Sequence, residues 1–340
     1  MQLKLLQPQD SARWDAFVSQ HSAGSFFHLS GWRKVIQDAY QHTCWYYYVE
    51  SQGQIVAVLP LAQIKSWLFG NKLISLPFAV SAGLLSENEQ ASQLLLTHAQ
   101  KLARDLKVDS LELRHRELKL PHWQSRHSHD NFCKSLADDS DAILAAIKKK
   151  QRAVVRQSLK NDLTFSIEDK VEPFFTIYSE SVRNLGTPVF PKKYFQTLLQ
   201  VFPNQVDVLT VYHQGEAVSS VMSFYFKQQV LPFYGGGKRQ ARGLKSNDFM
   251  YYQLMCHARR RGMLEFDFGR SKVASGAHAY KKHWGFEPQP LFYENDLVAS
   301  DELANINPNN PKYKFFIKVW QKLPLAVSQV VGPILAKDLG

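Results

Sequence analysis

Residues 214–221 read QGEAVSSV, in which a Gln-Gly turn leads into an apolar stretch with the pattern of a β-strand. The same arrangement occurs at residues 52–59, QGQIVAVL. A long helical pattern and a short strand follow each copy: ASQLLLTHAQKLARDL and SLELR after the earlier one, DFMYYQLMCHARRRG and LEFDF after the later one. Aromatics and a short amphipathic helix precede each copy, in SFFHLSGWRKVI and TPVFPKKYFQTL. The sequence therefore predicts two copies of one α/β unit.

The length of 340 residues suits two domains, each with its own core. The stretch that joins the copies has apolar residues at partly helical spacing and basic residues elsewhere, which predicts one helix. In the tail, Pro324 and Pro333 are expected to separate two short helices. The expected parts are an N-terminal domain, a connecting basic helix, a C-terminal domain and a helical tail, at residues 1–138, 139–161, 162–300 and 301–340.

The composition limits the class of protein. Hydrophobic residues make up 45% and charged residues 21%, a balance typical of a folded globular protein rather than a disordered one. The three cysteines, Cys44, Cys133 and Cys256, are far apart and too few for a disulfide framework, which indicates a reducing compartment. No signal-peptide segment and no bilayer-spanning apolar run is evident, so we expect a cytoplasmic protein. The net charge of +11 favours anionic partners.

A glycine-rich loop in LPFYGGGKRQARGLKSNDFMYYQL, residues 231–254, indicates an anion site. An apolar strand ends in three glycines, and a basic loop leads to a helix that Ser246, Asn247 or Asp248 can cap. Glycines admit a close backbone approach, and a helix N-terminus offers free N–H groups. A mobile hairpin loop with a solubilising charge cluster explains the same residues equally well. The candidate cofactor-binding residues are Gly235, Gly236, Gly237, Lys238, Arg239, Arg242, Lys245 and Ser246.

The second candidate site lies at the end of the predicted strand LEFDF, residues 264–268. Alternation along this strand places its two phenylalanines on one face and Asp267 on the other. Arg270 follows just past the strand end, with Lys272 close behind. The Asp267 carboxylate therefore either acts as a catalytic group in a cleft or forms a buried ion pair with Arg270 that fixes the turn.

The segment AHAYKKHWG, residues 277–285, predicts two helical turns that end at Gly285. Lys281 and Lys282 point in different directions on such a helix. At least one of them can therefore reach the strand end where Asp267 lies. These three residues are the catalytic candidates.

Several other chemistries lack their sequence signatures. The glycine-rich loop has neither the G-x-x-x-x-G-K-[ST] spacing of a P-loop nor the G-x-G-x-x-G of a Rossmann site. The twelve histidines show no H-E-x-x-H pattern, and RHSHD at residues 126–130 is typical of a solvated loop, so no metal site is expected. No G-x-S-x-G elbow is present. Acyl transfer to an amine fits best, because the amine is itself the nucleophile and the protein supplies positioning and charge stabilisation.

A resemblance to a known family covers nearly the whole chain. FDFGRSK, followed by Gly276 and YKKHWGFEP, is similar to the closing signature of the FemAB-like branch of the GNAT acyltransferase superfamily. In that signature, [YF]-D-F-G precedes a glycine and an F-K-K-x-[FW]-G element. Further similar stretches are FFHLSGWRKVI, LFGNKLISLPFAVSAGLL, KKKQRAVVRQSLK and LGTPVFPKKYF. The set most resembles the FemAB-related proteins associated with exosortase and PEP-CTERM systems of exopolysaccharide-producing bacteria.

The resemblance implies an α/β (α+β) fold of two tandem GNAT-like acyl-CoA N-acyltransferase domains, in agreement with the repeat. Members of the family move an amino acid from aminoacyl-tRNA to the amine of a peptidoglycan precursor with a lysine of the F-K-K element, and other GNAT proteins use acyl-CoA. That element corresponds to Lys281 and Lys282, although Tyr280 replaces its leading Phe. FGRSK stands where peptidoglycan-bridge enzymes usually carry a second glycine, so their donor and acceptor are not carried over.

The substrate-binding candidates come from several parts of the chain. Trp32, Arg33 and Lys34 match an N-terminal motif that, in members of the family it resembles, lies near the phosphates of the acceptor. The connecting helix, at residues 148–160, has more basic residues than a solvated face requires, so we expect it to line the cleft between the domains and to bind an anionic substrate. The candidates are Trp32, Arg33, Lys34, Arg152, Arg156, Arg270, Lys272 and Trp284.

The function expected first is an N-acyltransferase or aminoacyltransferase acting on the amine of a phosphorylated cell-envelope or exopolysaccharide precursor. Its donor is acyl-CoA or aminoacyl-tRNA, with no tightly bound cofactor. The alternative is a non-catalytic anion- or ligand-binding protein that retains the GNAT fold, and alanine at both Lys281 and Lys282 separates the two. A nucleic-acid binder has only the charge in its favour and lacks interleaved stacking aromatics.

The tail, residues 313–340, mixes aromatic and aliphatic residues with lysines. Such a mixture suits an interfacial helix pair on an anionic leaflet, at the inner membrane, near a lipid-linked acceptor. Packing on the second domain or a dimer contact accounts for the same residues equally well.

Overall fold

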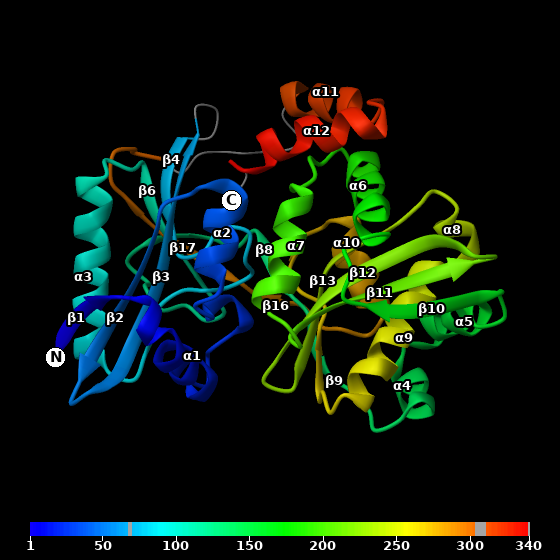
Figure 1. The fold of residues 1–340 in the computed structure, drawn as a ribbon, viewed down its shortest axis with the longest axis horizontal. Coiled ribbons are helices and arrows are strands. Elements are labelled where there is room, and N and C mark those ends of the chain that lie inside the picture. The colour runs from blue at the N-terminus through cyan, green and yellow to red at the C-terminus, as the bar shows by residue number, and fades with distance from the viewer. Residues whose placement is uncertain (67–69, 303–310, 339–340) are drawn as a thin grey trace. The chain divides into compact units, whose positions relative to one another are not determined.

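The computed structural model describes residues 1–66, 70–302 and 311–338, which fall into two compact units (Figure 1). The first unit consists of Met1–Ser128, Pro290–Ile306 and Lys337–Gly340. The second unit consists of His129–Gln289 and Asn307–Ala336.

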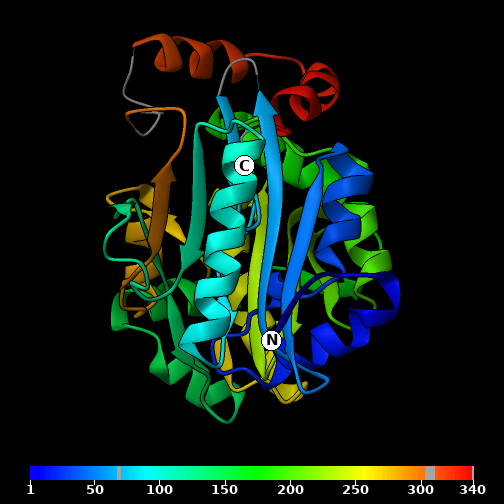
Figure 2. The same cartoon turned by 90° about the vertical axis from the view of Figure 1, so that its left-hand side faces the viewer.

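The first unit is built on one mixed sheet. The strands lie in the order β1-β2-β3-β4-β6-β17-β7, and β5 pairs with β3. Helix α3 covers one face of this sheet, and α1 and α2 pack on the other (Figures 1 and 2). The elements are β1 (Gln2–Leu5), η1 (Pro8–Asp10), α1 (Ser11–Gln20), η2 (Phe26–His28), α2 (Trp32–Tyr40), β2 (Cys44–Ser51), β3 (Gln54–Ser66), β4 (Gly70–Ile74), β5 (Leu85–Ser86), α3 (Glu89–Asp105), β6 (Ser110–His115), β7 (Gln124–Arg126) and β17 (Phe292–Leu297).

The second unit has a sheet in the order β10-β11-β12-β13-β14-β9. Helices α6 and α7 pack on one face, and α4, α5 and α9 lie on the other (Figure 1). The elements are β8 (His129–Asn131), β9 (Cys133–Ser135), α4 (Ser140–Ala146), α5 (Lys149–Ser158), β10 (Leu163–Glu168), α6 (Phe174–Leu185), α7 (Lys192–Val201), β11 (Val206–His213), β12 (Glu216–Phe226), β13 (Gln229–Gly237), α8 (Ala241–Leu244), α9 (Ser246–Arg260), β14 (Glu265–Asp267), β15 (Ser271–Lys272), α10 (Gly276–His283), β16 (Gln289–Pro290), α11 (Pro311–Trp320) and α12 (Leu325–Ala336).

The predicted repeat is confirmed down to the turns. Gln52 and Gly53 connect β2 to β3 with φ of 50° and 79°, and Gln214 and Gly215 connect β11 to β12 with the same two values. Positive φ at both central residues gives the backbone twist that a two-residue hairpin needs. In each unit the next strand, β4 or β13, is followed by a helix and then pairs in parallel with the strand that comes after it, β6 or β14. The two units therefore share one topology.

The structure draws the boundaries of the units differently from the expected ranges. Strand β17 follows the second unit in sequence, yet it pairs with β6 and β7 of the first unit's sheet. Strand β9 precedes the connecting segment, yet it pairs with β14 of the second unit. An unpaired edge at β6 or β14 would expose a row of backbone donors and acceptors. Each is covered by a strand that is distant in sequence, which local patterns do not reveal.

The connecting segment forms two helices, α4 and α5, rather than the single helix that its spacing predicts. The backbone is extended at Ile147 and Lys148, with ψ of 139° at both residues. The break lets α4 and α5 pack separately on α9, so that Ile143, Ile147 and Val155 all enter the same core. The single-helix prediction was therefore wrong, because independent packing of the two halves outweighs continuity.

The tail forms two helices, as predicted, but only one of the two prolines separates them. Pro324 lies between α11 and α12, whereas Pro333 is inside α12. The turn-rich residues 303–310 and the side chains of residues 311–315 lie outside the described part of the structure. In the ranges that are described, no helix is both long and apolar enough to cross a bilayer.

Strand β17 is held in the first unit by a buried carboxylate. Glu294 has no exposed surface, and its Oε2 lies 2.6 Å from Nδ1 of His115 on β6. Its Oε1 accepts hydrogen bonds from the backbone N–H groups of Lys119 and Leu120. One side chain thus satisfies a donor on β6 and two backbone donors in the segment that follows β6.

Replacing Glu294 with alanine should lower the free energy of unfolding by about 2–4 kcal/mol, because it leaves the buried His115 imidazole and two partly buried backbone N–H groups without their acceptor. Urea denaturation followed by circular dichroism measures this loss. Asp296→Ala is the matched control on the same strand: Asp296 is half-buried and accepts a bond from Gln100, so its loss should cost about 1 kcal/mol or less. Equal losses in the two variants would contradict a special role of Glu294.

Candidate active site

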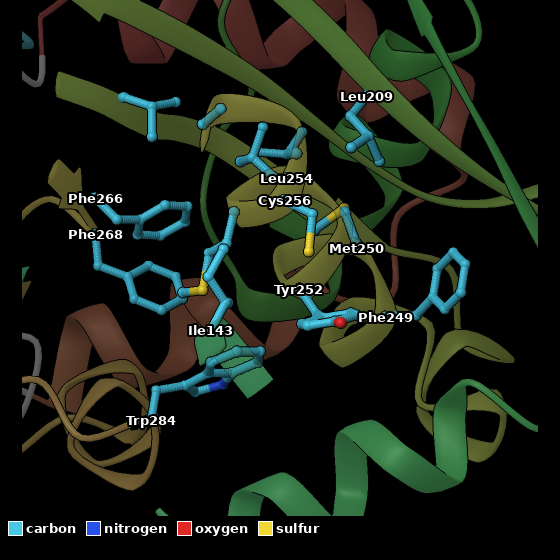
Figure 3. Packing of buried hydrophobic residues seen from close by; sticks show 14 of the residues in the cluster. Ile143, Leu209, Phe249, Met250, Tyr252, Leu254, Cys256, Phe266, Phe268 and Trp284 are labelled. Atoms are coloured by element: carbon cyan, nitrogen blue, oxygen red, sulfur yellow. The ribbon is translucent and has the colours of Figure 1, made fainter. Parts of the chain in front are cut away.

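The strand end after β14 rests on a buried aromatic cluster. The rings of Phe266 and Phe268 meet edge to face at 5.2 Å, and Trp284 packs on Phe268 at 6.2 Å. Figure 3 shows these three rings converging with Ile143 and Tyr252 in the core of the second unit. Both phenylalanines face this core, which confirms the predicted alternation. Trp284 is 1% exposed, so its ring serves packing and has no free surface for the substrate contact that the sequence suggested.

Asp267 closes the turn that leaves β14. Its side chain is fully buried, and Oδ1 accepts a hydrogen bond from the backbone N–H of Gly269 at 2.9 Å. Gly269 has a φ of 71°, which favours glycine at this position. The half-buried Arg270 follows, and its ion pair with Asp267 stays a prediction. Exposed Lys272 lies in β15, the short strand that pairs with β8.

Lys281 reaches this strand end from α10, as predicted for one of the two lysines. Its side chain is buried, and Nζ donates hydrogen bonds to the carbonyl oxygens of Gly269 at 2.9 Å and Arg270 at 3.0 Å. The rings of Phe132 and Phe268 flank the amine at 5.4 and 5.6 Å. Burial lowers the pKa of Lys281 to about 7, the charge of Asp267 opposes this shift, and Arg270 adds to it. The amine is thus close to half-protonated at neutral pH.

The hydrogen bonds of Lys281 determine what its neutral form can do. A neutral amine has two N–H groups and one lone pair. Both N–H groups are used by the two carbonyls, which leaves the lone pair to accept a proton from a reacting group. When protonated, the same nitrogen gains a third N–H, which can donate to a developing oxyanion. The arrangement suits a general base that then stabilises negative charge.

Lys282 lies on a different side of α10, beside an open cavity of about 720 Å³ that residues of the second unit line. This confirms that the two lysines point in different directions. Lys148 and Lys150 contribute from the start of α5, and His278 and His283 from α10. All three lysines are exposed. Three cations around one cavity favour an anionic ligand.

Asp248 of α9 connects the two helices that line this cavity, α5 and α10. Its Oδ1 accepts hydrogen bonds from Gln151 Nε2 of α5 at 2.6 Å and from the Tyr280 hydroxyl of α10 at 2.9 Å. Burial raises the pKa of the Asp248 carboxyl, and the two hydrogen bonds oppose that rise. Asp248 lies in the first turn of α9, just after the glycine-rich loop. The first turn of α9 therefore links the glycine-rich loop to the helices that line the cavity.

His278 and Asp130 form a pair that was not predicted from the sequence. Nε2 of His278 lies 2.9 Å from Oδ2 of Asp130, and the imidazole packs edge to face on Phe132 at 5.0 Å. Asp130 belongs to the stretch RHSHD and is 5% exposed in β8, whereas the sequence suggested a solvated loop there. No signal in the sequence pairs it with His278, because the two residues are joined only by the tertiary fold.

The glycine-rich loop departs from the predicted capping. Helix α9 begins at Ser246, which is buried and does not cap it; Lys245 occupies the N-cap with a φ of 54°. Two of the glycines are required by packing: a Cβ at Gly236 would lie 2.5 Å from Ser181, and one at Gly237 2.6 Å from Ala241. Their close approach to protein accounts for them without a ligand. The charged candidates of the loop are half-buried or exposed: Lys238, Arg239, Arg242 and Lys245.

Strands β13 and β14 separate near the candidate site. They pair in parallel only at Gln229 and Val230 of β13, although β13 continues to Gly237. Past this point, in the described part of the sheet, β13 presents a backbone edge beside the strand end that carries Gly269. An extended ligand can bind such an edge through main-chain hydrogen bonds.

The remaining substrate-binding candidates have structural contacts. In the first unit, Trp32 is fully buried and donates through Nε1 to the Phe26 carbonyl, while Arg33 donates to the Leu6 carbonyl. Exposed Lys34 pairs with Asp38. On α5, Arg152 donates to the carbonyl of Ala145 and Arg156 is exposed; the cavity is lined by other residues of that helix. Lys148 and Lys150 thus replace Arg152 and Arg156 as the basic residues of the cavity.

Comparisons with known proteins agree with this topology. Residues 142–282 match the family described as "Acetyltransferase (GNAT) domain". A lipid II:glycine glycyltransferase of Staphylococcus haemolyticus (strain JCSC1435) is 24% identical over 207 residues, which cover 57% of this chain. The match spans about half of that relative, 48% of its length.

Three solved structures share the fold. The crystal structure of FemX covers 93% of this chain and 100% of its own at 16% identity, with a TM-score of 0.69. A tandem GNAT protein from the clavulanic acid biosynthesis pathway covers 89% and 100% at 13% identity, with a TM-score of 0.56. L-PGS from Bacillus licheniformis covers 93% and 96% at 14% identity, with a TM-score of 0.52.

The GNAT match implies an acyl-CoA donor that binds as a substrate, whereas none of these comparisons supports aminoacyl-tRNA. Together they support an acyltransferase. Residues 142–282 match a GNAT acetyltransferase domain, and the chain has the mixed α/β fold of two tandem GNAT-like domains.

Proposed function

We propose that the second unit transfers an acyl group from acyl-CoA to the amine of a phosphorylated envelope precursor. The observation that carries this proposal is the buried Lys281 amine, with a pKa of about 7 and both N–H groups donated to backbone carbonyls. A purely structural lysine gains little from such a position, because burial penalises its charged form. A catalytic base requires a pKa near the working pH.

The reaction runs through a tetrahedral intermediate. The acceptor nitrogen attacks the thioester carbonyl carbon, the C–N bond forms, and the carbonyl π electrons move to oxygen. Lys281 Nζ accepts the proton that the nitrogen loses, and its new N–H donates to the oxyanion. When the intermediate collapses, the C–S bond breaks and the CoA thiolate takes the proton back from Lys281. Lysine and thiol both return to their initial protonation states.

The acceptor is inferred from the basic cavity. Lys148, Lys150 and Lys282 line a space of about 720 Å³, large enough for a phosphorylated sugar or peptide. The relative from Staphylococcus acts, by its name, on lipid II, which favours a lipid-linked precursor as the acceptor. The resemblance to exosortase-associated FemAB-related proteins favours an exopolysaccharide precursor over a peptidoglycan one. This choice of acceptor is part of the proposal.

Lys281→Gln should lower kcat/KM by about 100- to 1,000-fold, because glutamine keeps a polar group but cannot take up a proton. In the unmodified protein, kcat/KM should rise with pH through about 7 and then level off, since the base works only when neutral and the folded pKa is about 7. Steady-state assays of thiol release from acyl-CoA across this range measure both effects.

Lys282→Gln is the matched control on the neighbouring position of α10. It should raise KM for the acceptor and leave the pH-dependent limb in place, because Lys282 faces the cavity rather than the strand end. If kcat/KM of Lys281→Gln still rose with pH through about 7, Lys281 would not be the general base. Unchanged biological function with alanine at both lysines would favour the non-catalytic binding protein instead.

Reversing the charge of Lys150 and Lys282 together should weaken binding of a phosphorylated acceptor by about tenfold or more, because two cations beside the cavity become anions. Isothermal titration calorimetry with a nucleotide-linked amino sugar measures the change. The control, Lys101→Glu with Lys193→Glu, makes the same change in net charge at two exposed positions on α3 and α7. Equal weakening in both double variants would mean that the field of the whole protein, rather than the cavity, attracts the ligand.

The donor is tested by the salt dependence of binding. A CoA thioester has few phosphates, so its affinity should fall only shallowly with salt, whereas a tRNA would show a steep slope. A steep slope with aminoacyl-tRNA, together with no transfer from acyl-CoA, would replace the proposed donor.

A further inference from the structure

Helix α12 has two opposite faces of different character. Its inner face is made of small residues, Ser328, Gly332 and Ala336, which are all buried. Their spacing places them on one side of the helix, toward α6. A Cβ at Gly332 would lie 3.0 Å from Val189, so the close contact favours glycine there. Figure 1 shows α12 lying across the end of α6.

Polar contacts fix α11 and α12 to the same part of the unit. Gln329 of α12 donates through Nε2 to Ser179 Oγ on α6 at 2.8 Å. Trp320, the last residue of α11, is 3% exposed and donates through Nε1 to the Thr187 carbonyl. Arg183 donates to the carbonyl of Leu323, in the link between the two helices. The helix pair is thus docked before any partner arrives.

The outer face of α12 is apolar and exposed. Its residues recur at the i, i+3, i+4, i+7 spacing of a single helical stripe. They are Val327, Val330, Val331 and Ile334, with exposed fractions of 41%, 71%, 37% and 62%. Phe316 and Val319 of α11 are also exposed. A pre-ordered stripe of large apolar side chains in contact with water marks an interaction surface.

The charge around this stripe indicates what it meets. Residues 311–338 contain five lysines and one acidic residue, Asp338. Lys318, Lys322 and Lys337 are exposed, in or directly beside the two helices. Apolar side chains bordered by lysines match the boundary between acyl chains and anionic headgroups. A second copy of this chain would instead bring the same lysines against one another.

We propose that α11 and α12 form a docking surface for an anionic lipid bilayer, with the α12 stripe inserted among the headgroups and the lysines over their phosphates. The inference goes beyond the proposed function, because it concerns where the protein resides and holds for any reaction in the second unit. Combined with a lipid-linked acceptor, it would keep the enzyme at the surface that carries its substrate.

The test is co-sedimentation of the full-length protein with vesicles of phosphatidylcholine, with or without phosphatidylglycerol. We expect binding to the anionic vesicles, which weakens with salt, and about tenfold weaker binding by the double variant Val330→Gln with Ile334→Gln. Both residues are mainly exposed, so the variant should fold. The control is Leu118→Gln with Leu264→Gln, which changes two exposed apolar residues outside the tail and should bind like the unmodified protein.

Equal binding by the stripe variant and the unmodified protein, or no binding to anionic vesicles, would overturn the proposal. Sedimentation velocity tests whether the surface instead binds a second copy of this chain. A dimer that the stripe variant abolishes would assign the surface to that second copy. Transfer to a water-soluble amine should be the same in both proteins. Vesicle binding therefore tests the docking surface separately from the proposed function, which the activity of Lys281→Gln tests.

Discussion

The candidate site depends on the two hydrogen bonds from Lys281 to the backbone carbonyls of Gly269 and Arg270. They tie helix α10 to the turn after β14, and the aromatic rings around the amine keep water away. A lysine in this position costs the fold stability, since burial disfavours its charge. The same burial brings its pKa to about 7, where a proton can be exchanged in either direction. Burial of Lys281 thus both lowers the stability of the fold and gives the amine the pKa that the proposed mechanism needs.

In the proposed mechanism, helix α10 separates proton transfer from substrate recognition. Lys281 points into the aromatic core, and its neighbour Lys282 points to the basic cavity, because adjacent residues on a helix differ by about 100° in direction. Asp248 holds α5 and α10 together through Gln151 and Tyr280, so the position of the cavity and that of the base are coupled. A ligand that orders α5 would also order α10. The buried cluster that contains Phe266, Phe268 and Trp284 packs beneath both lysines.

The two units repeat one topology, and in both a strand at the edge of the sheet is covered by a further strand. In each, the strand after the long helix would end the sheet, and each acquires an antiparallel neighbour from a distant part of the chain. In the first unit this neighbour is β17, fixed by the buried Glu294. In the second it is β9. Because β17 belongs to the first unit and the tail helices that follow it belong to the second, neither unit is a continuous segment of the chain.

Local sequence determined the features that depend on short-range geometry. The Gln-Gly turns follow from local turn chemistry. The alternation of Phe266 and Phe268 about Asp267 and the different directions of Lys281 and Lys282 follow from periods of two and 3.6 residues. They could be read without a structure. The repeat could also be predicted, because the same order of turn, strand and helix patterns occurs twice in the sequence.

Only the tertiary structure decided which distant residues meet. The pairing of His278 with Asp130, the cavity shared by Lys150 and Lys282, and the burial of Trp32 and Trp284 join or enclose segments that no sequence period relates. Likewise, both faces of α12 are apolar or small in sequence. Which face packs and which stays exposed depends on where α6 lies. The physical reason is that burial is a property of neighbours in space, and a period along the chain specifies a face without specifying what covers it.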